Sequence, residues 1–363
     1  MDTAINIALM MRSVCALYTS RNSFSMMVDT VLSFRRKTLT QSIIIAIDAM
    51  GAKKGSRIIL EAMGRAAVHR DVQFLVFADK HEVTCPDYLQ HAAKFRHAEQ
   101  IPHDLDRAAI LRLRNTSMRL ALEAVRSGEA VAAISTGETG VFIGLARMIL
   151  RRKSGIQKPG LATMWPTLAR DCVMIDLGAN VESDGEVSGE ILRQYAYLGD
   201  SFARTLLKIE RPRVGLLSME EELMPEGFPH PRGAAYALIN DSDLNFCGYI
   251  DGADILKGNI DVIVSDGFTG NIALKTIEGW AKLAGEELKK SSRGSLIAKL
   301  GFLLARRQLQ LLRQRLNPEL YDGAAVLGLT GLAVKSHNNT TIYGFENAIR
   351  ITKILANNTE LFT

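Results

Sequence analysis

Short apolar runs alternate along the chain with longer stretches in which apolar residues recur at helical spacing. The runs predict strands at 43–47, 74–78, 130–134, 172–175, 214–217, 262–264 and 332–334. The periodic stretches predict helices at 58–68, 118–126 and 141–150. Strands that are apolar throughout are typical of sheets buried on both faces. The pattern therefore predicts an α/β fold with a mixed, mostly parallel sheet covered by helices.

Polar, glycine-containing turns follow four of the predicted strands, at 48–51, 135–140, 176–180 and 266–271. Ligands of α/β sheets sit beyond the carboxyl ends of the strands. Glycine lets backbone N–H groups approach an anion, and a helix N-terminus adds partial positive charge. A single turn of this kind needs no functional explanation. Four of them on one sheet edge, as expected here, indicate a phosphate-type ligand.

The composition is that of an ordinary globular protein. Of the 363 residues, 47% are hydrophobic and 23% are charged, which excludes a disordered chain. The net charge of +5 is modest, so nucleic acid is not an expected partner. The four cysteines are scattered without a Cys-x-x-Cys pair, which argues against a disulfide framework or zinc site and fits a reducing cytoplasm. We find no apolar stretch long enough to span a bilayer.

Residues 1–42 form an extension before the first predicted strand. Its first apolar run is preceded by Asp2 and followed by Arg12, the reverse of the charge order in a signal peptide. We expect a poorly ordered extension or an upstream start codon, with Met27 as an internal start. Residues 43–355 are then the α/β domain, and residues 356–363 a C-terminal tail.

A basic amphipathic segment spans residues 285–318. Between Arg293 and Pro318 it carries six cations and no acidic residue. One helical face is apolar and consists of Leu296, Leu300, Leu303 and Leu304. One reading is a packed helical hairpin or dimer-forming bundle with a basic polar face. The other is an interfacial element, including Arg306 and Arg307, that meets anionic lipid or the acidic surface of a partner protein.

The four turns belong to a longer series of ordered motifs. It continues with Pro159-Gly160-Leu161-Ala162-Thr163-Met164-Trp165-Pro166-Thr167, Arg211-Pro212-Arg213-Val214-Gly215-Leu216-Leu217, Tyr321-Asp322-Gly323-Ala324-Ala325-Val326-Leu327-Gly328 and Lys335-Ser336-His337. In this order they resemble the acyl-ACP:phosphate acyltransferases of bacterial phospholipid synthesis. The resemblance runs from about Ile43 to about Leu355, so it covers nearly all of the chain after the extension.

The resemblance implies a fold like that of phosphotransacetylases and of isocitrate and isopropylmalate dehydrogenases, usually as a homodimer. It implies that fatty acyl-ACP and inorganic phosphate give acyl phosphate and free carrier protein, without metal or cofactor. It also favours a projecting hairpin that dimerises at its base and touches membrane at its tip. The protein would then be cytoplasmic and peripherally membrane-associated, upstream of a glycerol-3-phosphate acyltransferase.

The residues and the resemblance together nominate site residues. Candidates for catalysis are Lys335, His337, Asn271 and Asp266. Candidates for binding substrate or phosphate are Ser135, Gly137, Glu138, Thr139, Gly140, Asp48, Lys53, Asn180 and Lys275. A thioester is already activated, so positioning and oxyanion stabilisation suffice for much of the rate. On sequence alone, Lys335 and Lys275 also fit solvated surface lysines, and His337 fits an ordinary loop residue.

The chain departs from the family pattern at positions that bear on phosphate. The family's Asp-Ala-Met-Gly-Gly-Asp is here Asp48-Ala49-Met50-Gly51-Ala52-Lys53, and Gly-Asn-Thr-Gly is Gly137-Glu138-Thr139-Gly140. A carboxylate 4 Å from phosphate costs about 4 kcal/mol per charge pair at an effective dielectric near 20. One hypothesis is that Lys53 pairs with Glu138 and compensates; the other is that both point to solvent.

Two alternative functions remain open. One is a phosphotransacetylase-like enzyme that uses acyl-CoA. The other is a catalytically impaired paralogue that keeps the fold and dimer as a binding scaffold. A dehydrogenase is the least favoured class, because no Gly-x-Gly-x-x-Gly follows the first strand and no metal-binding aspartate cluster is evident. The sequence identifies neither the acyl chain length nor the general acid.

Overall fold

The strands of the computed structural model form a single mixed sheet. The structure describes residues 42–101, 105–180, 187–219, 231–291, 295–315 and 317–358, and a compact unit begins at Ile43. The strands are β1 (Ile43–Asp48), β2 (Val72–Ala78), β3 (Ala93–His97), β4 (Ala132–Ser135), β5 (Gly160–Trp165), β6 (Cys172–Ile175), β7 (Arg213–Leu217), β8 (Asn245–Ile250), β9 (Val262–Val264), β10 (Ala324–Leu327) and β11 (Leu332–Lys335). Their order in the sheet is β3-β2-β1-β4-β11-β10-β5-β6-β9-β7-β8.

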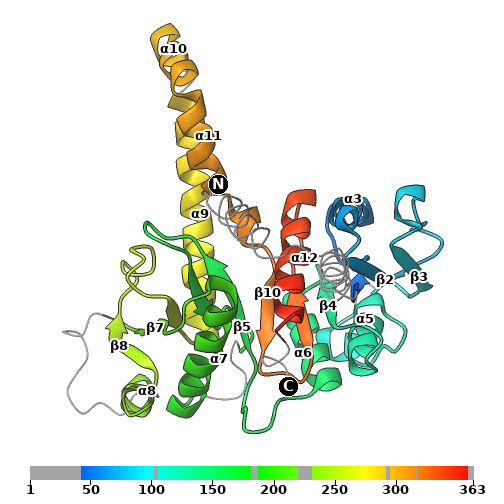
Figure 1. Cartoon of the computed structure of the whole chain (residues 1–363), viewed down its shortest axis with the longest axis horizontal. Coiled ribbons are helices and arrows are strands. Elements are labelled where there is room, and N and C mark those ends of the chain that lie inside the picture. The colour runs from blue at the N-terminus through cyan, green and yellow to red at the C-terminus, as the bar shows by residue number, and fades with distance from the viewer. Residues whose placement is uncertain are drawn as a thin grey trace, which may run out of the picture. The chain divides into compact units, whose positions relative to one another are not determined.

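Helices cover both faces of this sheet (Figure 1). The α-helices are α3 (Ser56–Ala66), α4 (Arg107–Ile110), α5 (Ser117–Arg126), α6 (Thr139–Leu150), α7 (Gly189–Leu207), α8 (Pro231–Asn240), α9 (Gly267–Ser291), α10 (Leu296–Leu304), α11 (Arg306–Arg315) and α12 (Ile342–Ala356). Short 3-10 turns are η1 (Ala67–His69), η2 (Asp87–Leu89) and η4 (Pro318–Tyr321). The predicted strands and helices are all present, with bounds shifted by at most a few residues, so the α/β prediction is confirmed.

Two apolar layers explain why the strands are apolar throughout. In β1, Ile45 and Ile47 pack on one face with residues of α3, α7, α8 and α12. Ala46 faces the opposite layer, which contains residues of α5 and α6 and is flanked by the first half of α9. Because both faces are buried, neither face of β1 needs polar residues.

Two reversals divide the sheet into blocks that run in opposite directions. β1, β2, β3, β4 and β11 are parallel to one another, as are β6, β7, β8 and β9. Between the blocks, β10 is antiparallel to β11 and β5, and β5 is antiparallel to β6. The carboxyl ends of β1 and β4 therefore emerge at the opposite edge from those of β6 and β9. The expectation that all four glycine-containing turns share one edge is wrong.

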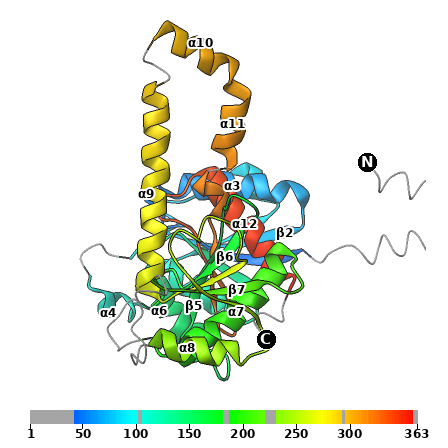
Figure 2. The ribbon, with the colours of Figure 1, turned by 90° about the vertical axis from the view of Figure 1, so that its left-hand side faces the viewer.

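The basic segment forms a helical extension of the sheet domain. In both views α9, α10 and α11 extend away from the sheet (Figure 1, Figure 2). From Gly279 onward nearly every described residue of α9 is exposed, including Trp280 at 66% and Leu283 at 56%. A helix break at Ala305 separates α10 from α11. All four positions of the predicted apolar face lie within α10, whereas Arg306 and Arg307 begin α11.

Candidate active site

Three neighbouring strands bring Asp48, Ser135 and Lys335 together at one edge of the sheet. Asp48 of β1 is in register with Ser135 of β4, and Ser135 is in register with Lys335 of β11. All three side chains are buried, with at most 6% of any residue exposed. Polar side chains buried side by side must satisfy one another or bind a ligand. We call this set, with the loop 136–141, the phosphate-side cluster.

The Asp48 carboxylate organises the phosphate-side cluster. Ser117 Oγ donates to its Oδ1 and Ser135 Oγ to its Oδ2, each at 2.6 Å. The Met50 amide also donates to Oδ1, at 3.1 Å. Ser117 is a residue that the sequence reasoning missed. Thr116 and Ser117 directly precede the predicted helix 118–126. Hydroxyl residues at that place are usually explained by helix capping, so the sequence alone did not indicate a role for Ser117 in the site.

Glycine lets two of the site loops pack against each other. A Cβ on Gly51 would lie 2.3 Å from the Gly137 amide nitrogen, and one on Gly137 would lie 2.3 Å from Met118 Cε. The Gly137 amide donates to Ser135 Oγ at 3.0 Å. This hydrogen bond lies in the turn that connects the end of β4 to the start of α6. Thr136, the residue between them, is fully buried. Its hydroxyl has no hydrogen-bond partner within the described part of the chain.

Glu138 is the N-cap of α6. Its Oε1 accepts from the Gly140 amide at 3.0 Å, and its Oε2 accepts from the Val141 amide at 2.7 Å. We expected phosphate to use the backbone amides of Gly137 to Gly140, and of these the Gly140 N–H is occupied by an internal carboxylate. Glu138 and Thr139 are at least partly exposed there. A negative side chain at a helix N-terminus is locally favourable, which explains why this residue is tolerated.

The proposed pairing of Lys53 with Glu138 is not found. Lys53 is exposed, and its backbone N–H donates to the Asn338 carbonyl at 2.8 Å. Among the ion pairs of the described residues, none joins Lys53 to Glu138. The physical reason is that the Glu138 carboxylate is already held by two backbone amides.

Lys335 is a buried cation at the carboxyl end of β11. Its ammonium donates to the adjacent Ser336 carbonyl. Burial lowers the pKa of Lys335 from 10.5 to about 8, opposed by the negative charges of Asp322, Asp48 and Glu138. Lysine is rarely buried without an anionic partner. A protonated Lys335 therefore favours an anion arriving beside it.

His337 and Lys275 approach the same region from two elements. Lys275, in the third turn of α9, forms an ion pair with Glu278 at 2.8 Å. Partial burial lowers the pKa of His337, and the charge of Lys275 lowers it further. The Asn339 amide donates to His337 Nδ1 at 3.1 Å, so Nδ1 is the acceptor nitrogen and Nε2 the donor. The structure thus groups His337 and Lys275 with Lys335.

The remaining candidates form a second cluster at the opposite edge, after β6 and β9. Asn180 Nδ2 lies within hydrogen-bond distance of the Pro159 carbonyl at 2.7 Å, of Asp176 Oδ2 at 2.9 Å and of Tyr195 Oη at 2.6 Å, which share its two N–H groups. Asn271 Nδ2 donates to the Leu177 carbonyl at 3.1 Å. The Asn271 amide therefore braces the backbone of the loop 176–180, whereas Asn180 ties the end of this loop to Pro159 and Tyr195. That Asn180 and Asn271 also donate to the substrate carbonyl oxygen stays a prediction.

Two carboxylates of this second cluster also have local roles. Asp266 accepts from the Thr269 amide at 2.9 Å and from Thr269 Oγ1 at 2.7 Å, as a cap at the start of α9. Burial raises the pKa of Asp176, against hydrogen bonds from Asn180, Ala179, Leu161 and Gly178. The hydrogen bonds of this cluster order the loop 176–180 and the start of α9.

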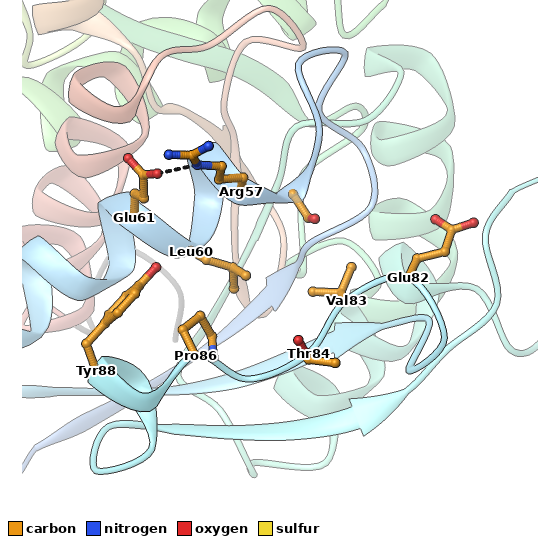
Figure 3. Close-up of a pocket in the computed structure, with 9 residues that line it drawn as sticks. Arg57, Leu60, Glu61, Glu82, Val83, Thr84, Pro86 and Tyr88 are labelled. Carbon is orange, nitrogen blue, oxygen red and sulfur yellow. Dashed lines mark hydrogen bonds and ion pairs between the residues drawn. The ribbon is translucent and has the colours of Figure 1, made fainter.

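A separate pocket of about 540 Å³ lies between α3 and the chain after β2 (Figure 3). Its walls include Leu60, Val83 and Pro86, and an Arg57–Glu61 ion pair of 2.6 Å lies at its side. Tyr88 completes the lining and would meet a Cβ on Gly64 at 2.8 Å. None of the predicted site residues lines this pocket.

The apolar residues predicted for membrane or carrier contact are exposed where the structure describes them. The exposed fractions are 58% for Leu300, 63% for Leu303 and 80% for Leu304. Leu296 begins α10, but its side chain lies outside the described set. Arg306 and Arg307 are exposed at the start of α11. Among the described helices, none is long and apolar enough to cross a bilayer.

The sheet order defines the class of fold. The structure resembles a branched-chain phosphotransacylase from Enterococcus faecalis V583, with a TM-score of 0.55 at 14% identity over 86% of this chain and 99% of that chain. It also resembles a phosphotransacetylase from Streptococcus pyogenes, with a TM-score of 0.55 at 14% identity over 94% of this chain and 100% of that chain. At this identity the likeness shows the fold alone: that of a phosphotransacylase.

Sequence comparison narrows this class to one family. Residues 43–360 match the model of the family described as "Fatty acid synthesis protein". A phosphate acyltransferase from Parvibaculum lavamentivorans is 40% identical over 324 residues, covering 86% of this chain and 88% of that protein. One from Granulibacter bethesdensis is 41% identical over 320 residues, covering 85% of each. The chain belongs to this family, whose members here are phosphate acyltransferases.

Proposed function

We propose that this protein transfers a fatty acyl group from the thioester of acyl carrier protein to inorganic phosphate in the phosphate-side cluster. The observation that carries the proposal is Lys335, a buried ammonium in register with Ser135 and close to the loop amides before α6. Cations and helix N-termini are the groups that proteins use to hold phosphate oxygens. Membership of the family supports the reaction.

The reaction needs little covalent participation from the protein. A phosphate oxygen attacks the thioester carbonyl carbon, the tetrahedral oxyanion collapses, and the C–S bond breaks. The acyl group is then bound to phosphate, and the carrier thiolate takes up a proton. Lys335 neutralises charge on phosphate, while backbone N–H groups near Gly137 and Gly140 position it. Positioning and electrostatic stabilisation are the usual main sources of rate in such a step.

Phosphate must compete with Glu138 for part of this site. The Glu138 side chain is exposed, so it can rotate away from the Gly140 and Val141 amides. We propose that this rotation accompanies phosphate binding, which would weaken the affinity for phosphate without removing the site.

Hydroxylamine trapping tests the proposed reaction. Purified protein is incubated with phosphate and either acyl-ACP or acyl-CoA, and acyl phosphate is trapped as the hydroxamate. Product from acyl-ACP supports the proposal. Product only from acyl-CoA would make the protein a phosphotransacetylase-like enzyme. A folded protein that gives no product with either donor would be the impaired paralogue.

We further propose that the helical extension serves for association. Trp280, Leu283 and Leu288 of α9 are exposed to 66%, 56% and 43%, which suits a second copy of the chain in a homodimer. On α10, Ile297 and Leu304 are exposed to 85% and 80% beside the basic start of α11. This combination suits an anionic membrane surface. Acyl phosphate would then form near a glycerol-3-phosphate acyltransferase that consumes it.

A further inference from the structure

The carboxylate of Asp322 lies at the centre of the loop that follows Lys335. Asp322 Oδ2 accepts from Ser336 Oγ at 2.9 Å and from Thr340 Oγ1 at 2.5 Å, and its Oδ1 accepts from the His337 amide at 2.9 Å. Three donors from a segment of five residues thus converge on one side chain. Removing such a carboxylate leaves the three donors to find other partners.

Asp322 is itself held in place by α12 (Ile342–Ala356). Its backbone carbonyl accepts from Asn347 Nδ2 at 3.0 Å. Gly323, which follows it, has a φ of +113° and would place a Cβ 2.9 Å from Ala348 Cα. A Cβ on Gly344 would lie 2.9 Å from Asp322 Oδ2. Close backbone approach on two sides therefore fixes the carboxylate relative to α12.

Asp322 also ranks first among the charged groups that favour protonated Lys335. The charged groups with the largest effects on the pKa of Lys335 are Asp322 before β10, Asp48 at the end of β1, Glu138 before α6 and Lys275 on α9. The first three raise the pKa of Lys335 and the last lowers it, with Asp322 the largest of these effects after burial. His337, in the loop after β11, is also coupled to Lys335, whose charge lowers the pKa of His337.

We propose that Asp322 is a positioning residue, which orders the loop 336–340 and keeps the neighbouring Lys335 ammonium available to the incoming phosphate. The inference rests on the proposed function for its catalytic consequence. Its structural part, the ordering of the loop, does not depend on that function. In an Asp322→Asn variant the side chain has one acceptor oxygen and no charge. It can therefore neither accept all three hydrogen bonds of the loop 336–340 nor favour the charged form of Lys335.

The variant Asp322→Asn tests the inference through the pH dependence of kcat/KM. Wild-type activity should fall as pH rises through about 8, where Lys335 loses its proton. In Asp322→Asn this fall should move to lower pH, because a charge that favours the ammonium is gone. Asp322→Glu should restore the wild-type limb at least in part. Asp254→Asn is the matched control, because Asp254 forms a surface ion pair with Lys257 at 2.8 Å.

The possible outcomes separate failure of the inference from failure of the function. A wild-type enzyme with activity and an unshifted basic limb in Asp322→Asn would overturn the inference. Hydrogen exchange of the His337 amide gives a readout that needs no turnover. We expect exchange at least tenfold faster in folded Asp322→Asn than in wild type or Asp254→Asn. Unchanged exchange of the His337 amide would overturn the claim that Asp322 orders the loop 336–340. An inactive wild type with the expected change in exchange would overturn only the proposed acyltransferase function.

Discussion

Replacing Lys335 with methionine should make the protein more stable while abolishing its activity. Only 6% of Lys335 is exposed, and burial lowers the pKa of Lys335 from 10.5 to about 8. A pKa difference of 2.5 between unfolded and folded states, at 1.36 kcal/mol per pKa unit, corresponds to about 3 kcal/mol. This is the cost at pH 7 of keeping the ammonium in its folded environment. Methionine has a similar unbranched stem and carries no charge.

The stability gained by Lys335→Met should be smaller than the cost of burying the ammonium. The variant loses the hydrogen bond from Lys335 to the Ser336 carbonyl, which contributes about 1 kcal/mol. We therefore expect the free energy of unfolding at pH 7 to rise by about 2 kcal/mol. The gain depends on pH in a defined direction. Between pH 8 and pH 10.5 the folded wild type has lost the Lys335 proton and the unfolded chain has not, so wild-type stability rises and the difference shrinks.

Urea unfolding at pH 7 and pH 10 measures both effects. Lys94→Met is the control, because Lys94 is an exposed lysine of β3 and should change stability by less than about 0.5 kcal/mol. Acyl phosphate formation by Lys335→Met should fall at least 100-fold, since its phosphate site lacks the cation. A variant that is less stable than wild type at pH 7, or that keeps wild-type activity, would refute this reasoning about Lys335.

Two further predictions concern the phosphate site and the helical extension. Glu138→Asn keeps a capping oxygen but removes a charge worth about 1 kcal/mol at 4 Å in water, so titration calorimetry should show about fivefold tighter phosphate binding. Adding Lys53→Ala should change this by less than about 0.5 kcal/mol, and strong coupling would revive the ion pair. Leu300→Glu with Leu304→Glu should abolish binding to anionic vesicles, and raised salt should weaken wild-type binding. Gln308→Glu is the control, and unaltered binding by the double variant would exclude α10 as the contact.

The strands were predictable because their signal is local. A strand buried on both faces is apolar at every position, and β6 and β9 match the predicted bounds at both ends. Four strands were not predicted, namely β3, β5, β8 and β10. The edge strands β3 and β8 are only partly buried, and β3 reads as the polar sequence Ala-Lys-Phe-Arg-His. Burial does not explain β5, which is buried at every position. The two reversals of strand direction were not predicted, because they involve β5 and β10, which were not predicted either. Only residues 166–171 join β5 to β6, which is too short for a parallel crossover.

The site was predictable in its parts but not in its connections. Lys335, Ser135 and Asp48 were identified because each follows or ends an apolar run. The sequence could not show that the Asn180 amide hydrogen-bonds to Asp176 and Tyr195, because these contacts depend on how the loop 176–180 packs against α7. Nor could it show that Glu138 caps α6, since a cap and a ligand-binding carboxylate have the same sequence signature.

The most direct test of the central claim is the initial rate of acyl phosphate formation from acyl-ACP as phosphate concentration is varied. For the wild type we predict a rate that saturates with phosphate and a product that contains the added phosphate. For folded Lys335→Met we predict at least a 100-fold lower kcat/KM for phosphate. A wild-type rate that does not depend on phosphate, or a fully active Lys335→Met, would contradict phosphate binding at the carboxyl ends of β1, β4 and β11.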